Sequence, residues 1–421
     1  MEPIAKENVR VRSIVKNVYE ENKYMLPHLP KTDEFLTTMN SLFDALRFLA
    51  IPVRGGYFVL ACSVIHFGLL AAIETGAIYK VIKVLAGLTL YSTGNRSVVA
   101  RVSGSIFYGN AAVSLVLMFR LRRSWTDISS TWAHTERCWG LIGPSRDKRL
   151  RPKMIFVIIF MAIGTVAEHV MSMISNVGLD CPWSEFLERY ILNSHAFILI
   201  QSDYNSRLGV ALFVVNKTAT IIWNLQDLII ILISMGLSSR YRRLNLCVQE
   251  LEGQLSSRRR KSDYEEYIQQ QTWRRIREAY VRQAALVRSV DKELGPLLLL
   301  SNSNNFYFIC LQLFLGIGGQ KSNIIDKSYV LVSIVWLLLR ACTVVLTAAN
   351  INIESKVALK SLYSCPKECF NIEVQRLQNQ LSRDSVALSG MGFFYLDRNM
   401  LLDVASAIFR YELVLLEFDK N

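Results

Sequence analysis

Long apolar runs separated by basic segments form the main pattern of the sequence. The first two runs, residues 57–73 and 98–119, each carry no more than one formal charge. As helices, both can cross about 30 Å of hydrocarbon. Four comparable runs follow at residues 154–174, 208–237, 297–318 and 329–349. Runs of this length are typical of transmembrane helices, so the pattern predicts an all-α membrane protein.

A seventh segment, residues 400–418, mixes apolar and charged positions, so hydropathy alone does not identify it. Four polar residues recur there at three-, four- and seven-residue steps along one helical stripe: Asp403, Ser406, Arg410 and Glu417. A polar stripe on an apolar helix must face protein or water rather than lipid. One such helix from each of several identical subunits would line an aqueous pore, in which Glu417 favours cations. The alternative is a helix buried in its own bundle with these charges paired.

The distribution of basic residues predicts the orientation of these spans. The segments before the first span, between the second and third, between the fourth and fifth, and after the sixth hold 8, 9, 13 and 6 Lys and Arg residues. Loops rich in Lys and Arg stay on the cytoplasmic side. We therefore expect seven transmembrane helices with a cytoplasmic N-terminus and an extracellular C-terminus, the reverse of a G-protein-coupled receptor. Asn95, in the sequon Asn95-Arg96-Ser97, then lies in the first outer loop as a candidate glycosylation site.

Charge and composition exclude several other classes of protein. The chain has 421 residues, of which 51% are hydrophobic, and a net charge of +13. In a soluble protein this charge would suggest nucleic-acid binding. Here it lies in loops beside a membrane, so membrane lipid and not nucleic acid is the expected partner. Its eight cysteines lack zinc-finger spacing, and the sequence has no P-loop, HExxH or GxSxG motif. We expect neither an enzyme nor a metal or cofactor.

Helical patterns continue into the predicted cytoplasmic segments. Residues 240–294 predict two amphipathic helices broken near residues 253–262, and residues 373–381 predict a shorter one. We expect four parts along the chain: a cytoplasmic N-terminal segment (1–56), a six-helix ligand-binding bundle that includes the extensions at 240–294 (57–350), a cytoplasmic linker with a short helix (351–398), and a pore-lining seventh helix with the external C-terminus (399–421).

Polar and aromatic residues inside the predicted spans are candidates for a ligand site, because ionisable groups in a bilayer are costly. The third to sixth spans contribute Glu168, His169, Trp223, Asn224, Asp227, Asn304, Tyr307, Gln312, Trp336 and Arg340. Aromatic planes that stack on C–H faces, together with carboxylates and amides that bind hydroxyl groups, are the components of a sugar site. The alternative is a buried polar network of Asp227, Asn304 and Arg340 that fixes helix packing. The sequence leaves both interpretations open.

Four segments of the sequence resemble a known family. They are residues 223–245 (WNLQDLIIILISMGLSSRYRRLN), 297–314 (LLLLSNSNNFYFICLQLF), 337–356 (LLLRACTVVLTAANINIESK) and 388–418 (LSGMGFFYLDRNMLLDVASAIFRYELVLLEF). They resemble the insect gustatory receptors and, within them, the sugar-receptor branch. The resemblance covers most of residues 57–418 and is strongest in the last third.

The resemblance implies a sugar-sensing receptor in the plasma membrane of chemosensory neurons. It implies a ligand-gated, non-selective cation channel, assembled as a homotetramer or as a heterotetramer with related receptors, with a sugar pocket in the outer half of each bundle. The pore and gate would include Asp403, Arg410, Tyr411, Glu412, Glu417 and Phe418. The family signature is Thr-Tyr, five residues and Gln-Phe, so Arg410 and Glu417 depart from it, whereas Tyr411, Phe418 and the branch-typical Glu412 are retained.

Two other functions are compatible with seven spans. One is a secondary transporter of sugars or ions, and the other is a seven-helix receptor that signals through partner proteins. Transporters usually show an internal repeat with broken helices at the midplane. The sequence shows no such repeat, and an odd number of spans argues against two equal halves. The distribution of basic residues disfavours the signalling receptor.

Overall fold

The structure is a computed structural model that describes residues 34–49, 51, 53, 56–88, 98–139, 147–256, 263–317, 324–367 and 370–418. Its α-helices are α2 (Glu34–Leu46), α3 (Tyr57–Leu85), α4 (Val98–Trp139), α5 (Leu150–Val177), α6 (Phe186–Ser194), α7 (Ser206–Ser256), α8 (Asp263–Ile317), α9 (Ile324–Lys356), α10 (Ala358–Tyr363), α11 (Ile372–Arg383) and α12 (Asn399–Phe418). Two short 3-10 helices, η1 (Arg47–Leu49) and η3 (Gln201–Asp203), lie among them. Apart from one isolated bridge between Ser389 and Tyr395, no β-structure occurs in the described residues. The all-α prediction is confirmed.

Among the described residues, five helices are long and apolar enough to cross a membrane: α3, α4, α5, α7 and α9. The fifth predicted span falls in α8 and the seventh in α12, and both segments are helical. Neither reaches the apolar composition of the other five within the described residues. Polar side chains lower the hydropathy of both segments, for example Asn304 and Asn305 in α8 and Asp403 in α12.

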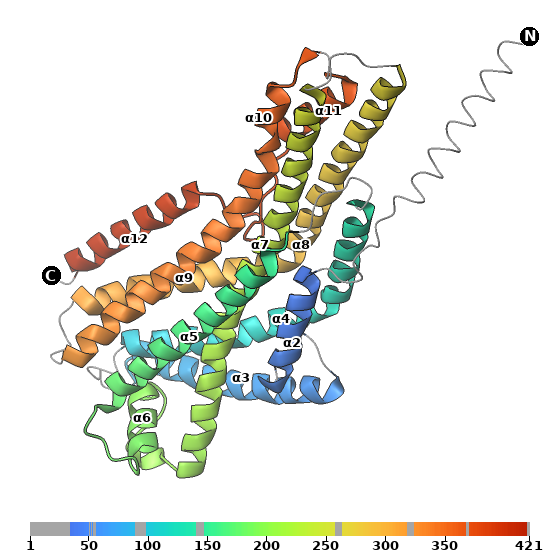
Figure 1. The fold of residues 1–421 in the computed structure, drawn as a ribbon. Helices are drawn as coiled ribbons and strands as arrows, with labels where there is room; N and C mark the ends of the chain where they lie inside the picture. Colours follow the sequence, from blue (N-terminus) through green and yellow to red (C-terminus); the bar gives the residue numbers. More distant parts are fainter. Residues whose placement is uncertain are drawn as a thin grey trace, which may run out of the picture.

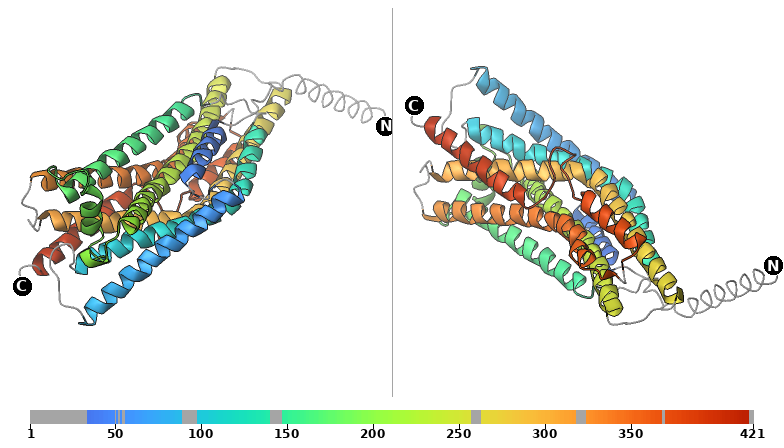
Figure 2. Two further views of the ribbon diagram at one scale, coloured as in Figure 1. Left: turned by 90° about the horizontal axis from the view of Figure 1, so that it is seen from below. Right: turned by 90° about the horizontal axis from the view of Figure 1, so that it is seen from above.

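α7 and α8 extend along an elongated bundle (Figure 1). α7 has 51 residues, roughly 75 Å of helix, which is more than twice the thickness of the hydrocarbon core. α10 and α11 lie at one end of the bundle and α6 lies at the other, whereas α12 lies along one side beside α8 and α9 (Figure 2). The amphipathic helices predicted at residues 240–294 are continuations of α7 and α8. Of the predicted break at residues 253–262, residues 253–256 still belong to α7, and residues 257–262 lie outside the described residues.

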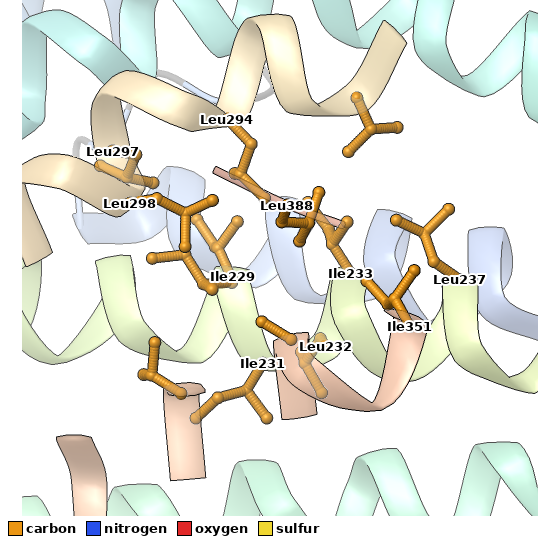
Figure 3. Close-up of a cluster of buried hydrophobic side chains, with 14 of the residues drawn as sticks. Ile229, Ile231, Leu232, Ile233, Leu237, Leu294, Leu297, Leu298, Ile351 and Leu388 are labelled. Carbon is orange, nitrogen blue, oxygen red and sulfur yellow. The ribbon is translucent and has the colours of Figure 1, made fainter. Parts of the chain in front are cut away.

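α7 forms the centre of the bundle. In the most apolar stretch of α7, 83% of the residues are buried inside the protein. The corresponding share is 11% in α3 and in α5, so the apolar faces of these two helices are left for lipid. Figure 3 shows this core, which includes Ile229, Ile231, Leu232, Ile233, Leu237, Leu294, Leu297, Leu298, Ile351 and Leu388. Because protein covers α7 on all sides, its sequence is apolar all round rather than on one stripe.

α2 packs its aromatic side chains against the bundle. Phe35 stacks on Trp132 of α4 with ring centroids 4.1 Å apart, and Phe43 meets Trp125 edge to face at 4.7 Å. Phe35 fits there because Gly236 of α7 has no side chain: a Cβ at this position would lie 2.6 Å from the Phe35 ring. The described part of the N-terminal segment therefore belongs to the core.

A small hairpin, residues 388–396, anchors the connection between α11 and α12 to α8. Asp291 of α8 accepts hydrogen bonds from Ser389 N at 2.6 Å and from Ser389 Oγ at 2.8 Å. The hairpin backbone also lies against Gly295, where a Cβ would come within 3.3 Å of Ser389 O. Pro296 follows and removes a helical hydrogen bond, and α8 bends in this region (Figure 1). The connection to α12 is therefore attached to α8 at its bend.

Candidate functional site

A cavity of about 310 Å³ lies among α4 to α9, toward the α6 end of the bundle. This volume is near the lower end of the roughly 300–1,000 Å³ that is usual for small-molecule sites. Seven of the ten residues predicted for a ligand site line it: Glu168, His169, Trp223, Asn224, Gln312, Trp336 and Arg340. Further aromatic rings in its wall come from Phe107, Tyr108, Tyr190, Phe197, Phe308 and Tyr329. The cavity therefore combines aromatic faces with hydrogen-bonding groups.

The other three predicted residues are not part of the cavity lining. Asp227 lies one helical turn, roughly 6 Å, beyond Trp223 toward the centre of the bundle. Asn304 lies one turn beyond Phe308 in the same direction, and its buried amide has no hydrogen-bond partner among the described residues. Tyr307 packs edge to face on Phe308 with ring centroids 5.2 Å apart.

A buried ion pair between Asp227 and Arg340 forms the layer beneath the cavity. Arg340 Nε lies 2.8 Å from Asp227 Oδ2, with the two side chains 2% and 0% exposed. Arg340 donates hydrogen bonds to Asn224 Oδ1 at 2.5 Å and to Asn305 Oδ1 at 3.0 Å, and its guanidinium lies 4.5 Å from the centre of the Trp223 ring. One arginine therefore joins α7, α8 and α9 at the floor of the cavity, and Asp227 neutralises its charge.

Glu168 and Trp336 place a carboxylate and an indole on the same side of the cavity, where α5 meets α9. Glu168 Oε1 accepts a hydrogen bond from Ser333 Oγ at 3.1 Å, which holds the carboxylate at the wall. The Trp336 ring packs near Phe160 with centroids 5.9 Å apart. A carboxylate accepts hydrogen bonds from hydroxyl groups, and an aromatic face packs on C–H groups. This wall can therefore contact both kinds of surface on a sugar ring.

A chain of hydrogen bonds that the sequence analysis missed lines the α6 end of the cavity. Lys217 Nζ donates to Tyr190 Oη at 3.0 Å, and Tyr190 donates to Asn216 Oδ1 at 3.0 Å. Asn216 Nδ2 donates in turn to Tyr108 Oη at 3.1 Å. Lys217 Nζ also lies 2.5 Å from His169 Nε2 and 4.3 Å from the centre of the Tyr190 ring. These contacts fix the orientation of four side chains that line the cavity: Tyr108, His169, Tyr190 and Asn216.

The same chain ends at His195, which is fully buried directly after α6 and faces Tyr108 of α4. Tyr108 donates to His195 Nε2 at 2.6 Å, so the proton of the neutral ring is on Nδ1 and is donated to Ser194 Oγ at 2.8 Å. Ser194 Oγ then donates to Tyr190 O at 2.7 Å. Burial lowers the pKa of His195 to about 4, so the ring is neutral near pH 7.

The predicted pore stripe lies on α12. Asp403, Ser406 and Arg410 are exposed in the single chain, and Arg410 Nε donates to Ser406 O at 3.3 Å. The other predicted pore and gate side chains lie outside the described residues, as does the sequon residue: Tyr411, Glu412, Glu417, Phe418 and Asn95.

Comparison of the sequence with known proteins gives matches along most of the chain. The trehalose receptor family matches residues 67–421. The chain is 31% identical over 327 residues to the gustatory receptor for sugar taste 64a of Drosophila melanogaster, which covers 75% of this chain and 69% of that protein. It is 30% identical over 332 residues to the gustatory receptor 5a for trehalose of the same species, with 77% of this chain and 70% of that protein covered.

Comparison with solved structures gives the same arrangement of helices. The insect olfactory receptor OR5 from Machilis hrabei superposes with a TM-score of 0.65 and 10% sequence identity, covering 92% of this chain and 100% of that chain. The same receptor in complex with eugenol superposes with a TM-score of 0.62. At this identity the likeness concerns the fold.

Proposed function

Because this chain belongs to the trehalose receptor family of insect gustatory receptors, we propose that it is a sugar-gated, non-selective cation channel of chemosensory neurons. It is a multi-pass protein of the plasma membrane. The observation that carries the proposal is the cavity, in which aromatic faces surround a fixed carboxylate, amides and a guanidinium. Two relatives named for sugar taste and for trehalose support a sugar as the ligand.

Each kind of group in the cavity has a task in binding a sugar. Glu168 accepts hydrogen bonds from hydroxyl groups, and Arg340 and Gln312 can donate to hydroxyl or ring oxygens. The rings of Trp223 and Trp336 cover the C–H faces. Because Ser333 holds Glu168 and Asp227 holds Arg340, these groups are oriented before the ligand arrives, which lowers the entropy that binding must overcome.

The proposed topology has seven spans, with α8 and α12 as the fifth and the seventh. In this orientation the α10–α11 end is cytoplasmic and the cavity opens toward the outside. The basic residues of the predicted cytoplasmic segments support it. α8 can cross despite its polar residues because its Ser301, Asn304 and Asn305 are buried in the protein rather than exposed to lipid.

Epitope tags test this orientation. A tag placed after Asn421 should be labelled by antibody on intact cells, and a tag placed before Met1 only after permeabilisation. Labelling of both tags after permeabilisation serves as the control for expression. The reverse pattern on intact cells would contradict the topology and the channel with it.

We further propose that α12 lines the pore of a homotetramer or of a heterotetramer with related receptors. In the single chain, the stripe of Asp403, Ser406 and Arg410 is exposed, and a charged stripe needs protein or water beside it. α8 connects the two functional parts, because Phe308 and Gln312 line the cavity whereas Asp291 holds the hairpin before α12. A sugar that moves the outer half of α8 therefore moves the attachment of α12.

The C-terminal departures from the family signature give a prediction about permeation. A ring of Glu417 carboxylates near the permeation axis should attract divalent cations. Glu417→Gln should therefore leave the channel functional but lower the permeability ratio of Ca²⁺ to Na⁺, measured from reversal potentials. Phe418→Ala should raise the current measured without sugar. The small alanine side chains leave a wider opening at this level of the pore, which no longer closes by dewetting. Arg410→Thr, which restores the family residue, should be tolerated.

Glu185→Gln is the matched control, because Glu185 is an exposed carboxylate next to α6 and is not part of α12. It should leave the permeability ratio unchanged. A change with Glu412→Gln and none with Glu417→Gln would show that the helix presents a different face to the pore.

Whole-cell recording from cells that express only this chain tests the proposed function. A panel of monosaccharides and disaccharides should evoke a cation current that returns to baseline when the sugar is removed. A surface-expressed protein that gives no current with any sugar would contradict the proposal for the homomeric receptor. A slow sugar-coupled current that shows no channel noise would favour a transporter.

A further inference from the structure

Two glycines leave room for aromatic rings that form part of the cavity wall. At Gly164 of α5, a Cβ would lie 2.1 Å from Cη2 of Trp336. At Gly104 of α4, a Cβ would lie 2.8 Å from Cε2 of Phe197. Carbon atoms in a packed interior do not approach this closely, so each ring occupies space that any other residue would fill. Both rings line the cavity.

The contacts of Trp336 show where its ring would move if residue 164 had a side chain. Gly164 is not itself in the cavity lining, whereas the Trp336 indole against it is, so at this position the indole lies between α5 and the cavity. Phe160 packs on the indole from α5, at 5.9 Å between centroids. The open volume beside the indole is the cavity, and a methyl group at residue 164 would push the ring into it.

Phe197 is constrained in a similar way. Its carbonyl accepts a hydrogen bond from Arg101 Nη1 at 3.2 Å, which fixes the backbone. Phe197 is only 5% exposed. The centre of its ring lies 6.2 Å from that of Tyr108 and 5.9 Å from that of His195. A methyl group at Gly104 would therefore displace the ring within a wall whose other members are held by hydrogen bonds.

We infer that Gly104 and Gly164 set the width of the cavity and thereby the size of the sugar that the receptor accepts. The inference rests on the proposed function and adds the determinant of ligand size. A cavity of about 310 Å³ has little spare volume, so a shift of one ring by about 1 Å should exclude a disaccharide before it excludes a monosaccharide. The two glycines act through Trp336 and Phe197 and are positioning residues.

Competition binding to purified receptor, with glucose and trehalose as probes, tests the inference. Gly164→Ala and Gly104→Ala should each raise the ratio of the trehalose Kd to the glucose Kd by about tenfold, as is typical when a pocket loses the space of a small group. Gly164→Ala combined with Trp336→Phe should move the ratio back toward wild type, because the smaller ring restores the space.

Gly236→Ala is the matched control. It also meets an aromatic ring, that of Phe35 at 2.6 Å, but on α7 far from the sugar cavity. It should lower stability without changing the ratio. An unchanged ratio in both Gly104→Ala and Gly164→Ala would overturn the inference and leave the proposed function standing. If Gly164→Ala does not fold, an unchanged ratio in Gly104→Ala overturns it. A wild-type receptor that binds neither sugar would overturn the proposed function as well.

Discussion

Arg340→Ala should remove most of the receptor from the cell surface. Asp227 is fully buried and Arg340 is its ion-pair partner at 2.8 Å. Removing one partner of a buried pair leaves an uncompensated charge and typically costs about 3–5 kcal/mol, out of a total stability of about 5–15 kcal/mol. Surface biotinylation and the thermal unfolding midpoint of the detergent-solubilised protein measure the loss.

Two variants distinguish this effect from a general effect of losing an arginine. Arg274→Ala removes an exposed ion pair with Glu278 within α8, and such a pair contributes about 1 kcal/mol at most. This variant should leave surface levels unchanged. Asp227→Leu combined with Arg340→Met replaces the pair with apolar side chains and should restore surface expression. Wild-type surface levels of Arg340→Ala would show that the pair does not hold the three helices together.

Glu168→Ala and Trp336→Ala should leave the receptor at the surface but weaken its response to sugar. A hydrogen bond to a charged group contributes about 1.5–3 kcal/mol, or roughly 10- to 150-fold in affinity. Glu168→Ala should therefore shift the concentration–response curve by that factor. Trp336→Ala should have a comparable effect, because the indole is the aromatic wall beside the carboxylate.

Glu185→Gln provides the control for these variants, since Glu185 is an exposed residue next to α6 that does not line the cavity. Its concentration–response curve should match wild type. Wild-type curves for both Glu168→Ala and Trp336→Ala, at normal surface levels, would assign these two residues to packing rather than to binding.

The sequence was sufficient for the helical architecture because apolar runs and their interruptions depend on local composition. The runs placed α3, α4, α5, α7 and α9, and the helical spacing in residues 240–294 placed the extensions of α7 and α8. It did not predict α6, since a helix of nine residues within a predicted outer loop has no apolar run to mark it.

The sequence did not show which of the polar residues line the cavity and which lie beneath its floor. Trp223 and Asp227 lie four residues apart on nearly the same face of α7, so periodicity alone cannot separate a residue of the wall from one beneath the floor. Their roles depend on Arg340, which reaches both from α9. The hydrogen-bonded chain from Lys217 to His195 was missed because it joins α4, α6 and α7 through tertiary packing. The polar pair Asn216-Lys217, which interrupts the apolar run at residues 208–237, was its one sequence signal.

Recording from excised outside-out patches tests most directly whether this chain is itself a sugar-gated channel. The patches come from cells that express only this chain, with no nucleotide in the pipette, and a disaccharide is applied rapidly to the outer face. We predict discrete cation-selective openings that begin within milliseconds and stop when the sugar is removed. Sugar-evoked currents in whole cells that disappear in every excised patch would contradict this account, because they would require a diffusible partner between the receptor and the pore.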